Sequence, residues 1–353
     1  MYIELKDINK TFGNYKASDH VEFGIEKGKL VALLGPSGSG KTTILRMIAG
    51  LEHQDSGDIY IDGKCVNELL VRERGIGFVF QNYALFPYMT VFDNVAYGLK
   101  VRKEDKKVIE KRVEELLELV DLKGLEKRYP TQLSGGQRQR VAFARALAPN
   151  PRVLLLDEPF AAIDAKVRKE LRSWLKDMID KIGITSIFVT HDQDEAVEVA
   201  DEIIVTNQGR VEQMGTPTEI YKNPKTPFVA QFIGESAVIT DYDRLKGFHL
   251  YSGCSRAIIR PEFVKAVRYG TEKRYQSLYA EGIVEQVSFR GSCLELLVNV
   301  NGILLKTVQS FEEEPFQKGE KVEVIVYRLY AVDEKEAHLI QNEGFQENEM
   351  FYI

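Results

Sequence analysis

The feature of this sequence that most restricts its fold is a set of five short apolar runs. They span residues 30–34, 76–80, 153–156, 187–189 and 203–205. Strands without polar side chains are typical of parallel sheets, because helices cover both faces of such a sheet. The chain is therefore predicted to be an α/β protein built on a parallel sheet.

Polar residues or a glycine follow the first four of these runs. Gly35, Gln81 and Asp157 end the first three, and His191 follows the fourth after Thr190. In an open α/β sheet, ligands bind beyond the carboxyl ends of the strands. We expect these positions to converge on one functional site.

The segments around these runs predict two domains, as the length of 353 residues also suggests. Alternating apolar residues near the N-terminus predict a half-exposed antiparallel sheet. Between about residues 82 and 150, helical spacing of apolar residues indicates a helical insertion. Thr216 and Thr226, each followed by proline, predict the starts of two short helices. We expect a first domain at 1–235 and a second at 236–353.

The second domain is predicted to be a β-barrel. Leu294, Leu296 and Val298 alternate with other residues up to Asn301-Gly302, and a second apolar segment follows. Asn-Gly between two such segments is a strong signal for a tight hairpin. We expect about five strands in a small closed or nearly closed barrel of the oligomer-binding (OB) type.

The bulk composition excludes several classes of protein. Hydrophobic residues make up 44% and charged residues 28%, which favours a packed core over disorder. No apolar run is long enough to cross a bilayer, and the alternation that begins at Ile3 leads us to expect no secretion or transit signal. Three widely spaced cysteines suit a reducing cytoplasm, and a net charge of -6 argues against nucleic acid as the main partner.

A glycine-rich loop after the first apolar run carries the clearest chemistry. It consists of Gly35, Pro36, Ser37, Gly38, Ser39, Gly40, Lys41, Thr42 and Thr43. Its glycines let backbone N–H groups turn toward phosphate oxygens, and the following helix adds the positive potential of its N-terminus. Lys41 is expected to reach the β- and γ-phosphates of a nucleotide, and Thr42 to ligate Mg²⁺.

Two acidic residues, Asp157 and Glu158, follow the third apolar run. Two acids at a strand exit are commonly only solvated, but the phosphate-binding loop upstream favours a catalytic role. Asp157 suits the coordination of Mg²⁺, and Glu158 suits a general base or a carboxylate that orients water.

A second glycine-rich segment is formed by Ser134, Gly135, Gly136 and Gln137. By itself, such a segment is most often the N-terminal cap of a helix. It can also hold a phosphate through the serine and backbone N–H groups. Because the chain has one lysine-bearing loop but two phosphate cradles, we expect the second cradle to serve the nucleotide of a partner copy.

Taken together, these motifs resemble the ATP-binding cassette (ABC) family over about residues 1–235, and they follow the order typical of that family. The resemblance implies that Phe12 stacks on adenine, and that Gln81 senses Mg²⁺ and the attacking water. It also implies that Asp164 stabilises the dimer contact beside the opposite nucleotide. His191 is implied to contact the γ-phosphate and to position the general base.

The resemblance further implies an importer ATPase with a C-terminal regulatory barrel (TOBE/OB-like), similar to those serving sulfate, maltose, polyamines, iron or molybdate. Segments 165–175, 198–201, 259–262 and 327–330 look most like the sulfate/thiosulfate importers. The implied partners are a second copy of the chain, two transmembrane permease subunits and a solute-binding protein, at the cytoplasmic side of the membrane.

Two details depend on the same resemblance. Ile163 stands where a leucine often precedes the aspartate, a change that conserves volume. The apolar segment 83–89 after Gln81 is expected to form a groove for a short permease helix. The alternative is that these residues belong to the core of the helical insertion.

Two other classes of protein stay open at this point. One is an ABC ATPase of DNA repair or translation, but such proteins usually carry two cassettes or long insertions, and a basic surface. The other is a regulatory binding module in which Arg256, Arg260 and Arg290 hold an anion, although arginines on a barrel are more often solvated. The single lysine-bearing loop and the acidic net charge favour transport.

Overall fold

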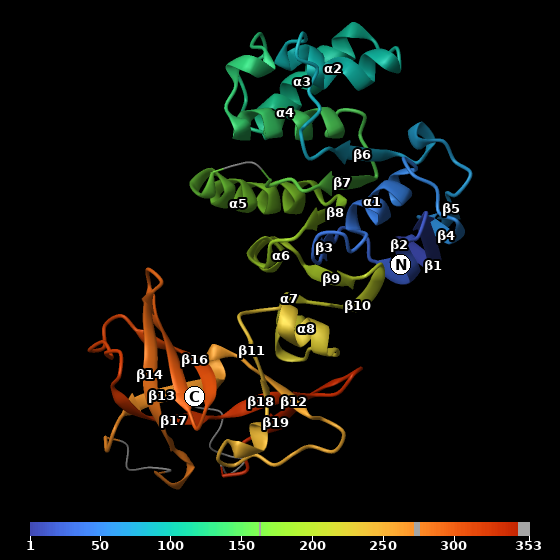
Figure 1. The fold of residues 1–353 in the computed structure, drawn as a ribbon. Helices are drawn as coiled ribbons and strands as arrows, with labels where there is room; N and C mark the ends of the chain where they lie inside the picture. Colours follow the sequence, from blue (N-terminus) through green and yellow to red (C-terminus); the bar gives the residue numbers. More distant parts are fainter. Residues whose placement is uncertain (162–163, 272–275, 345–353) are drawn as a thin grey trace. The chain divides into compact units, whose positions relative to one another are not determined.

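The computed structural model describes residues 1–161, 164–271 and 276–344 (Figure 1). The chain divides into two compact units, Met1–Pro217 and Thr218–Ile353. Ile163, noted above for its volume, lies outside the described residues. Within the described ranges, none of the helices combines the length and the apolar character needed to cross a membrane.

All five apolar runs lie in one six-stranded sheet of the first unit. Its strands, in spatial order, are β10 (Arg210–Gly215), β9 (Glu202–Asn207), β3 (Leu30–Leu34), β8 (Thr185–Thr190), β7 (Val153–Asp157) and β6 (Ile76–Val79). Neighbouring strands from β9 to β6 run parallel, and β10 is antiparallel to β9. Strands β3, β7 and β8 are buried along their whole length, as covered strands should be. The predicted α/β class is confirmed.

An antiparallel sheet packs on the same core. It has the order β2 (Tyr15–Ile25), β1 (Ile3–Phe12), β4 (Ser56–Ile61) and β5 (Lys64–Cys65). Helix α1 (Lys41–Ala49) joins the two sheets through Ile44, Leu45 and Ile48, which are fully buried. Because α1 starts directly after β3 and the glycine-rich loop, this shared core fixes the position of that loop.

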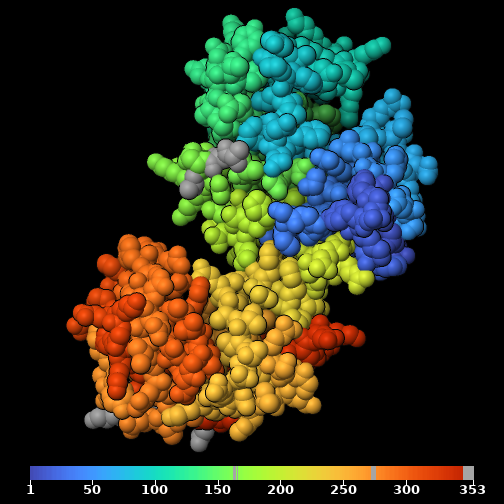
Figure 2. Space-filling view, viewed as in Figure 1, coloured from blue at the N-terminus to red at the C-terminus, as the bar shows by residue number. Residues whose placement is uncertain are grey.

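The helical insertion forms a distinct lobe of the first unit, drawn in teal to green in Figure 2. It contains α2 (Val91–Val101), α3 (Lys106–Leu119) and α4 (Gly135–Leu147). The apolar stripe predicted for the second of these helices is buried at Ile109, Val113, Leu116 and Leu117. Helices α5 (Ala165–Ile182) and α6 (Gln193–Val199) complete the unit beside the six-stranded sheet (Figure 1).

The second unit contains two antiparallel sheets. The five-stranded sheet has the order β13 (Val264–Arg268), β17 (Lys321–Val326), β14 (Ala280–Phe289), β15 (Cys293–Val300) and β16 (Ile303–Ser310). Asn301 and Gly302 form the predicted hairpin turn with φ of 53° and 88°. The Thr307 hydroxyl donates to the Val264 carbonyl at 2.5 Å, so the first and last strands meet and the sheet curls on itself. This arrangement agrees with an OB-like barrel.

A four-stranded sheet adds to this barrel and was not expected from the sequence. Its order is β11 (Ala237–Thr240), β12 (Arg256–Ile259), β18 (Arg328–Val332) and β19 (Ala337–Gln341). Short strands far apart in the sequence form it, which explains why local alternation alone did not reveal it.

The division of the chain after Pro217 precedes the boundary at residue 235 expected from the sequence. Helices α7 (Pro217–Lys222) and α8 (Pro227–Phe232) therefore fall at the start of the second unit. One reason is Arg260, which is fully buried and donates to the Tyr221 carbonyl. Its guanidinium lies 3.9 Å from the ring centroid of Tyr221 and 5.0 Å from that of Tyr330. Arg260 thus has a packing role and is not a solvated arginine.

Candidate nucleotide site

The glycine-rich loop curves between β3 and α1, as its sequence predicted. Gly38 and Gly40 have φ of 80° and 93°, a region that favours glycine. Ser39 anchors the loop from behind through a 3.0 Å hydrogen bond between its hydroxyl and that of Thr206. The loop is therefore a tight turn at the N-terminus of a helix, which is the geometry that binds phosphate.

Lys41 lies inside this loop. Its side chain is buried, and Nζ donates to the carbonyl oxygens of Gly35 and Pro36 at 2.7 and 2.8 Å. Burial lowers the pKa of Lys41 below its ordinary value, and the negative charges of Glu158 and Asp157 oppose this shift. An ammonium group so poorly solvated gains strongly from contact with a phosphate.

Thr42 and Asp157 form a pair suited to a hard cation. The Thr42 hydroxyl donates to Oδ1 of Asp157 at 3.0 Å. Burial raises the pKa of the Asp157 carboxyl, and the hydrogen bond from Thr42 acts in the opposite direction. Mg²⁺ prefers such oxygen ligands, so these residues fit the predicted ion.

Glu158 is oriented from both sides by the two other residues predicted to be catalytic. Nε2 of Gln81 donates to Oε2 at 2.8 Å, and Nδ1 of His191 lies 3.5 Å from Oε1. The Glu158 backbone has φ of 46°, which is rare for a residue with a side chain and costs free energy. The predicted convergence of the strand ends is therefore found in the structure.

Phe12 lies at the end of β1, across a tight turn from Tyr15 of β2. It is 46% exposed, and Nζ of Lys10 lies 5.0 Å from its ring centroid. The sequence reasoning missed Tyr15, whose hydroxyl donates to the Gly38 carbonyl of the phosphate loop. The sequence signal that could have identified Tyr15 is its position opposite Phe12, with only Gly13-Asn14 between the two aromatic residues.

Tyr15 also lines a cavity of about 410 Å³ next to the phosphate loop. The cavity is bounded by Asn14, Tyr15, Lys16, Pro36, Ser37, Gly38, Ser39, Asn207 and Gln208. This space lies between the hairpin that carries Phe12 and the loop itself, where a nucleoside attached to a loop-bound phosphate would extend.

The second glycine-rich segment forms the start of α4 and stays exposed at Ser134. The Ser134 hydroxyl accepts from the Gln137 backbone N–H at 3.2 Å, and the Gln137 side chain accepts from the Ser134 N–H at 3.0 Å. Gly136 packs closely on α5, because an added Cβ would lie 3.2 Å from a methyl group of Val167. Among the described residues, no recorded hydrogen bond joins this segment to the loop at 35–43.

Asp164 caps the start of α5. Its Oδ1 accepts from the Val167 N–H at 3.0 Å, and the residue is otherwise exposed. The structure therefore separates the predicted residues into two groups. One group surrounds the phosphate loop, and the other lies at the starts of α4 and α5, where Ser134 and Asp164 are exposed.

The segment after Gln81 is held by α4. Tyr83 and Ala84 both have positive φ, and Arg145 donates to their carbonyl oxygens at 2.6 and 2.5 Å. Tyr88, further along the segment, is 93% exposed. The segment is thus fixed at its base by Arg145, while Tyr88 is exposed.

The fold and the site define a P-loop ATPase of the ATP-binding cassette class. A family model described as "ABC transporter" matches residues 18–161. The chain is 60% identical to the "Sulfate/thiosulfate import ATP-binding protein CysA" of Synechococcus elongatus over 237 residues, which is 67% of this chain and 69% of that protein. The protein of that name from a Synechocystis species is 49% identical over 300 residues, or 84% of each chain.

Solved structures agree with this classification. The ATP-binding cassette MJ0796, in a dimeric post-hydrolysis state bound to ADP and Pi, has a TM-score of 0.55 and 36% identity, covering 61% of this chain and 98% of that one. The cbiO1 protein of Clostridium perfringens, from the cbiONQ transporter complex, has a TM-score of 0.58 and 32% identity, covering 62% and 90%. The chain belongs to the ABC transporter family and is an ATP-binding subunit of the transport ATPase type.

Proposed function

We propose that this chain is the ATP-hydrolysing subunit of a sulfate or thiosulfate importer and that it works as a homodimer. The proposal that the chain hydrolyses ATP rests on the Gln81–Glu158–His191 group, which lies beside the Thr42–Asp157 pair. Relatives that are 49% and 60% identical are named as sulfate/thiosulfate import proteins, which supports sulfate or thiosulfate as the solute.

ATP binding is assigned to the loop and the hairpin next to it. Phe12 stacks on adenine, and the backbone N–H groups of the loop surround the phosphates. Lys41 exchanges its contacts with loop carbonyls for the β- and γ-phosphates. Thr42, Asp157 and Gln81 are the residues that would hold Mg²⁺, which neutralises phosphate charge when bound.

Hydrolysis is assigned to Glu158 as the general base for the attacking water. Gln81 and His191 contact the two oxygens of this carboxylate, so they fix its direction before the nucleotide arrives. His191 also contacts the γ-phosphate. Positioning supplies most of the catalysis in phosphoryl transfer, which suits a carboxylate fixed in this way.

The segment at the start of α4, where Ser134 is exposed, is assigned to the partner's nucleotide. Ser134, Gly135, Gly136 and Gln137 receive the γ-phosphate, and Asp164 stabilises the contact beside it. Because both subunits then contact the γ-phosphate, ATP stabilises the closed dimer more than ADP does. A ligand shifts a two-state equilibrium only by such a difference in affinity, so hydrolysis opens the dimer.

The segment 83–89 is assigned to the membrane partner. Its exposed Tyr88 and its position directly after Gln81 support a groove that receives a permease helix at the cytoplasmic face of the membrane. Two permease subunits and a solute-binding protein complete the transporter. The opening and closing of the ATPase dimer is then transmitted to the permeases through Gln81.

Glu158→Gln tests the catalytic assignment. The amide keeps the size of the side chain but cannot accept a proton, so ATP turnover should fall by about 100-fold or more. The variant should also accumulate as an ATP-bound dimer in size-exclusion chromatography. Glu118→Gln, an exposed surface change, is the matched control. Retained turnover without a trapped dimer would show that Glu158 is not the base.

A solute panel tests the transport assignment separately. The complete transporter is reconstituted, and ATPase stimulation is measured with sulfate, thiosulfate, molybdate, maltose, a polyamine and ferric iron. Stimulation by sulfate or thiosulfate is expected. If only another solute stimulates the ATPase, the assignment of sulfate or thiosulfate is wrong, while the ATPase mechanism is unaffected.

A further inference from the structure

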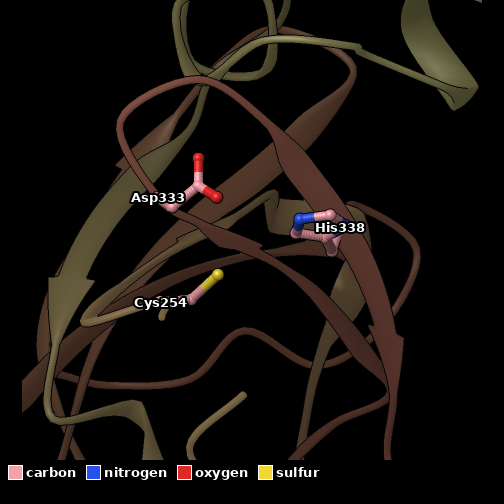
Figure 3. A group of neighbouring side chains, drawn as sticks. All are labelled: Cys254, Asp333 and His338. Carbon is pink, nitrogen blue, oxygen red and sulfur yellow. The ribbon is translucent and has the colours of Figure 1, made fainter. Parts of the chain in front are cut away.

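Three potential metal ligands meet in the second unit, and none of them belongs to the nucleotide site. Cys254, Asp333 and His338 each offer a ligand atom, and these atoms all lie within 4.8 Å of one another. Figure 3 shows the thiol, the carboxylate and the imidazole turned toward a common space. Cys254 is buried, and the other two residues are half-buried.

The topology of the four-stranded sheet brings these residues together. In the β18–β19 pair, Ala331 lies opposite His338, so these two side chains share a face of the sheet. Asp333 follows β18 directly and continues that face, since side chains alternate along a strand. Cys254 reaches the same end from the loop before β12, the other neighbour of β18.

Surrounding groups hold two of the three side chains in place. Oδ1 of Asp333 accepts backbone N–H groups of Lys335 and Glu336, each at 2.7 Å. The imidazole of His338 packs on the Tyr251 ring with centroids 5.1 Å apart, and its Nε2 lies 3.6 Å from Oε2 of Glu336. A carboxylate next to a ligand histidine is the usual supporting contact in metal sites.

The combination of thiol, imidazole and carboxylate selects the ion. Ca²⁺ and Mg²⁺ prefer oxygen ligands alone, whereas Zn²⁺ accepts sulfur, nitrogen and oxygen in tetrahedral geometry. Bonds of about 2.0–2.3 Å to Zn²⁺ put tetrahedral ligand atoms roughly 3.3–3.8 Å apart. Side-chain movements of about 1 Å would therefore close this site, starting from separations of up to 4.8 Å.

One of the three potential ligands, His338, also lines a cavity. This cavity of about 440 Å³ is lined by His338 and Glu336 together with Lys222, Lys225 and Tyr330. We propose that Cys254, Asp333 and His338 bind one Zn²⁺, with a water molecule in the fourth position. The ion links the β18–β19 hairpin to the loop before β12.

The test uses the full-length chain, freed of metal and kept reduced. Zn²⁺ binding is measured by competition with a chromophoric chelator, and one tight equivalent per chain is expected. With Co²⁺ as the probe, a thiolate-to-cobalt charge-transfer band is expected, because it requires a direct sulfur–metal bond. Asp333→Asn and His338→Gln should each weaken Zn²⁺ binding by 10-fold or more, and Cys254→Ser should abolish the band.

Matched controls come from the same chain. Cys65→Ser and Cys293→Ser remove the other two cysteines, and His249→Gln removes an exposed histidine. All three should bind Zn²⁺ as the unchanged chain does. The absence of a tight equivalent, or a cobalt band that survives Cys254→Ser, overturns the proposal.

Thermal melting covers the case in which Cys254→Ser does not fold. Zn²⁺ should raise the Tm of the unchanged chain, because a ligand that binds only the folded state stabilises it. Asp333→Asn keeps an oxygen acceptor for the two backbone N–H groups, so it should fold but show a smaller rise at the same Zn²⁺ concentration. An equal rise in both proteins contradicts the site.

Discussion

Gly40 gives a sharp test of how the phosphate loop is held. Its φ is 93°, and an added Cβ would lie 1.9 Å from the carbonyl oxygen of Ala17 in β2. Ordinary contact begins near 3.4 Å, so Gly40→Ala must separate the loop from β2 by about 1.5 Å. The left-handed conformation adds about 1–2 kcal/mol for a residue with a Cβ.

Such a displacement acts directly on catalysis, because Gly40 immediately precedes Lys41 and Thr42. A misplacement of about 1 Å in a catalytic site costs about 100-fold in rate. We therefore expect Gly40→Ala to lower kcat/KM for ATP by about 100-fold, and to weaken binding of a fluorescent ATP analogue. Both quantities are measured on the full-length chain, together with its melting temperature.

Gly63→Ala is the matched control. Gly63 has φ of 71° in the turn between β4 and β5, but an added Cβ would meet nothing within 4 Å. It should lose the same 1–2 kcal/mol or so of stability while keeping normal ATP binding and turnover. If the two variants bind and hydrolyse ATP equally well, the contact with Ala17 does not determine the shape of the loop, and the reasoning fails.

Three further changes give independent tests. Asp157→Asn should abolish Mg²⁺-dependent turnover yet raise the Tm of the nucleotide-free protein at neutral pH. Burial raises the pKa of Asp157 in the folded state, so its charge reduces stability as pH rises through that pKa, and the Tm difference should vanish in acid. Arg145→Ala removes two hydrogen bonds to the segment after Gln81, and should leave basal ATPase within a few-fold while permease stimulation falls by about 10-fold. Phe12→Ala should weaken ATP binding by about 10-fold in a titration, whereas Phe12→Trp should preserve it.

Much of the nucleotide site could be predicted from the sequence because its functional residues lie at the ends of strands. Gly35, Gln81, Asp157 and His191 each follow an apolar run, and parallel strands bring their carboxyl ends to one edge. The Asn301-Gly302 hairpin was equally accessible, since a turn of this kind depends on two adjacent residues.

Other features depend on contacts between distant residues, which no local pattern encodes. Arg145 lies more than 60 residues from the carbonyls of Tyr83 and Ala84 that it contacts. The pairing of β12 with β18 spans a similar gap and forms the Cys254–Asp333–His338 group. Separate cysteine and histidine residues without a spacing motif gave no sign of a shared site.

Helix α4 has contacts at its two ends whose combination has a thermodynamic consequence. Ser134 caps its first turn, and Arg145, about 16 Å further along at 1.5 Å per residue, holds the backbone beyond Gln81. A helix of this length moves nearly as one body, so a tilt of α4 at Ser134 also displaces Arg145. If the partner's nucleotide docks at Ser134 and a permease docks beyond Gln81, each must alter the other's affinity by an equal factor, since linkage is reciprocal. Binding of a permease would then change the affinity of the dimer for ATP by the same factor by which ATP changes the affinity for the permease.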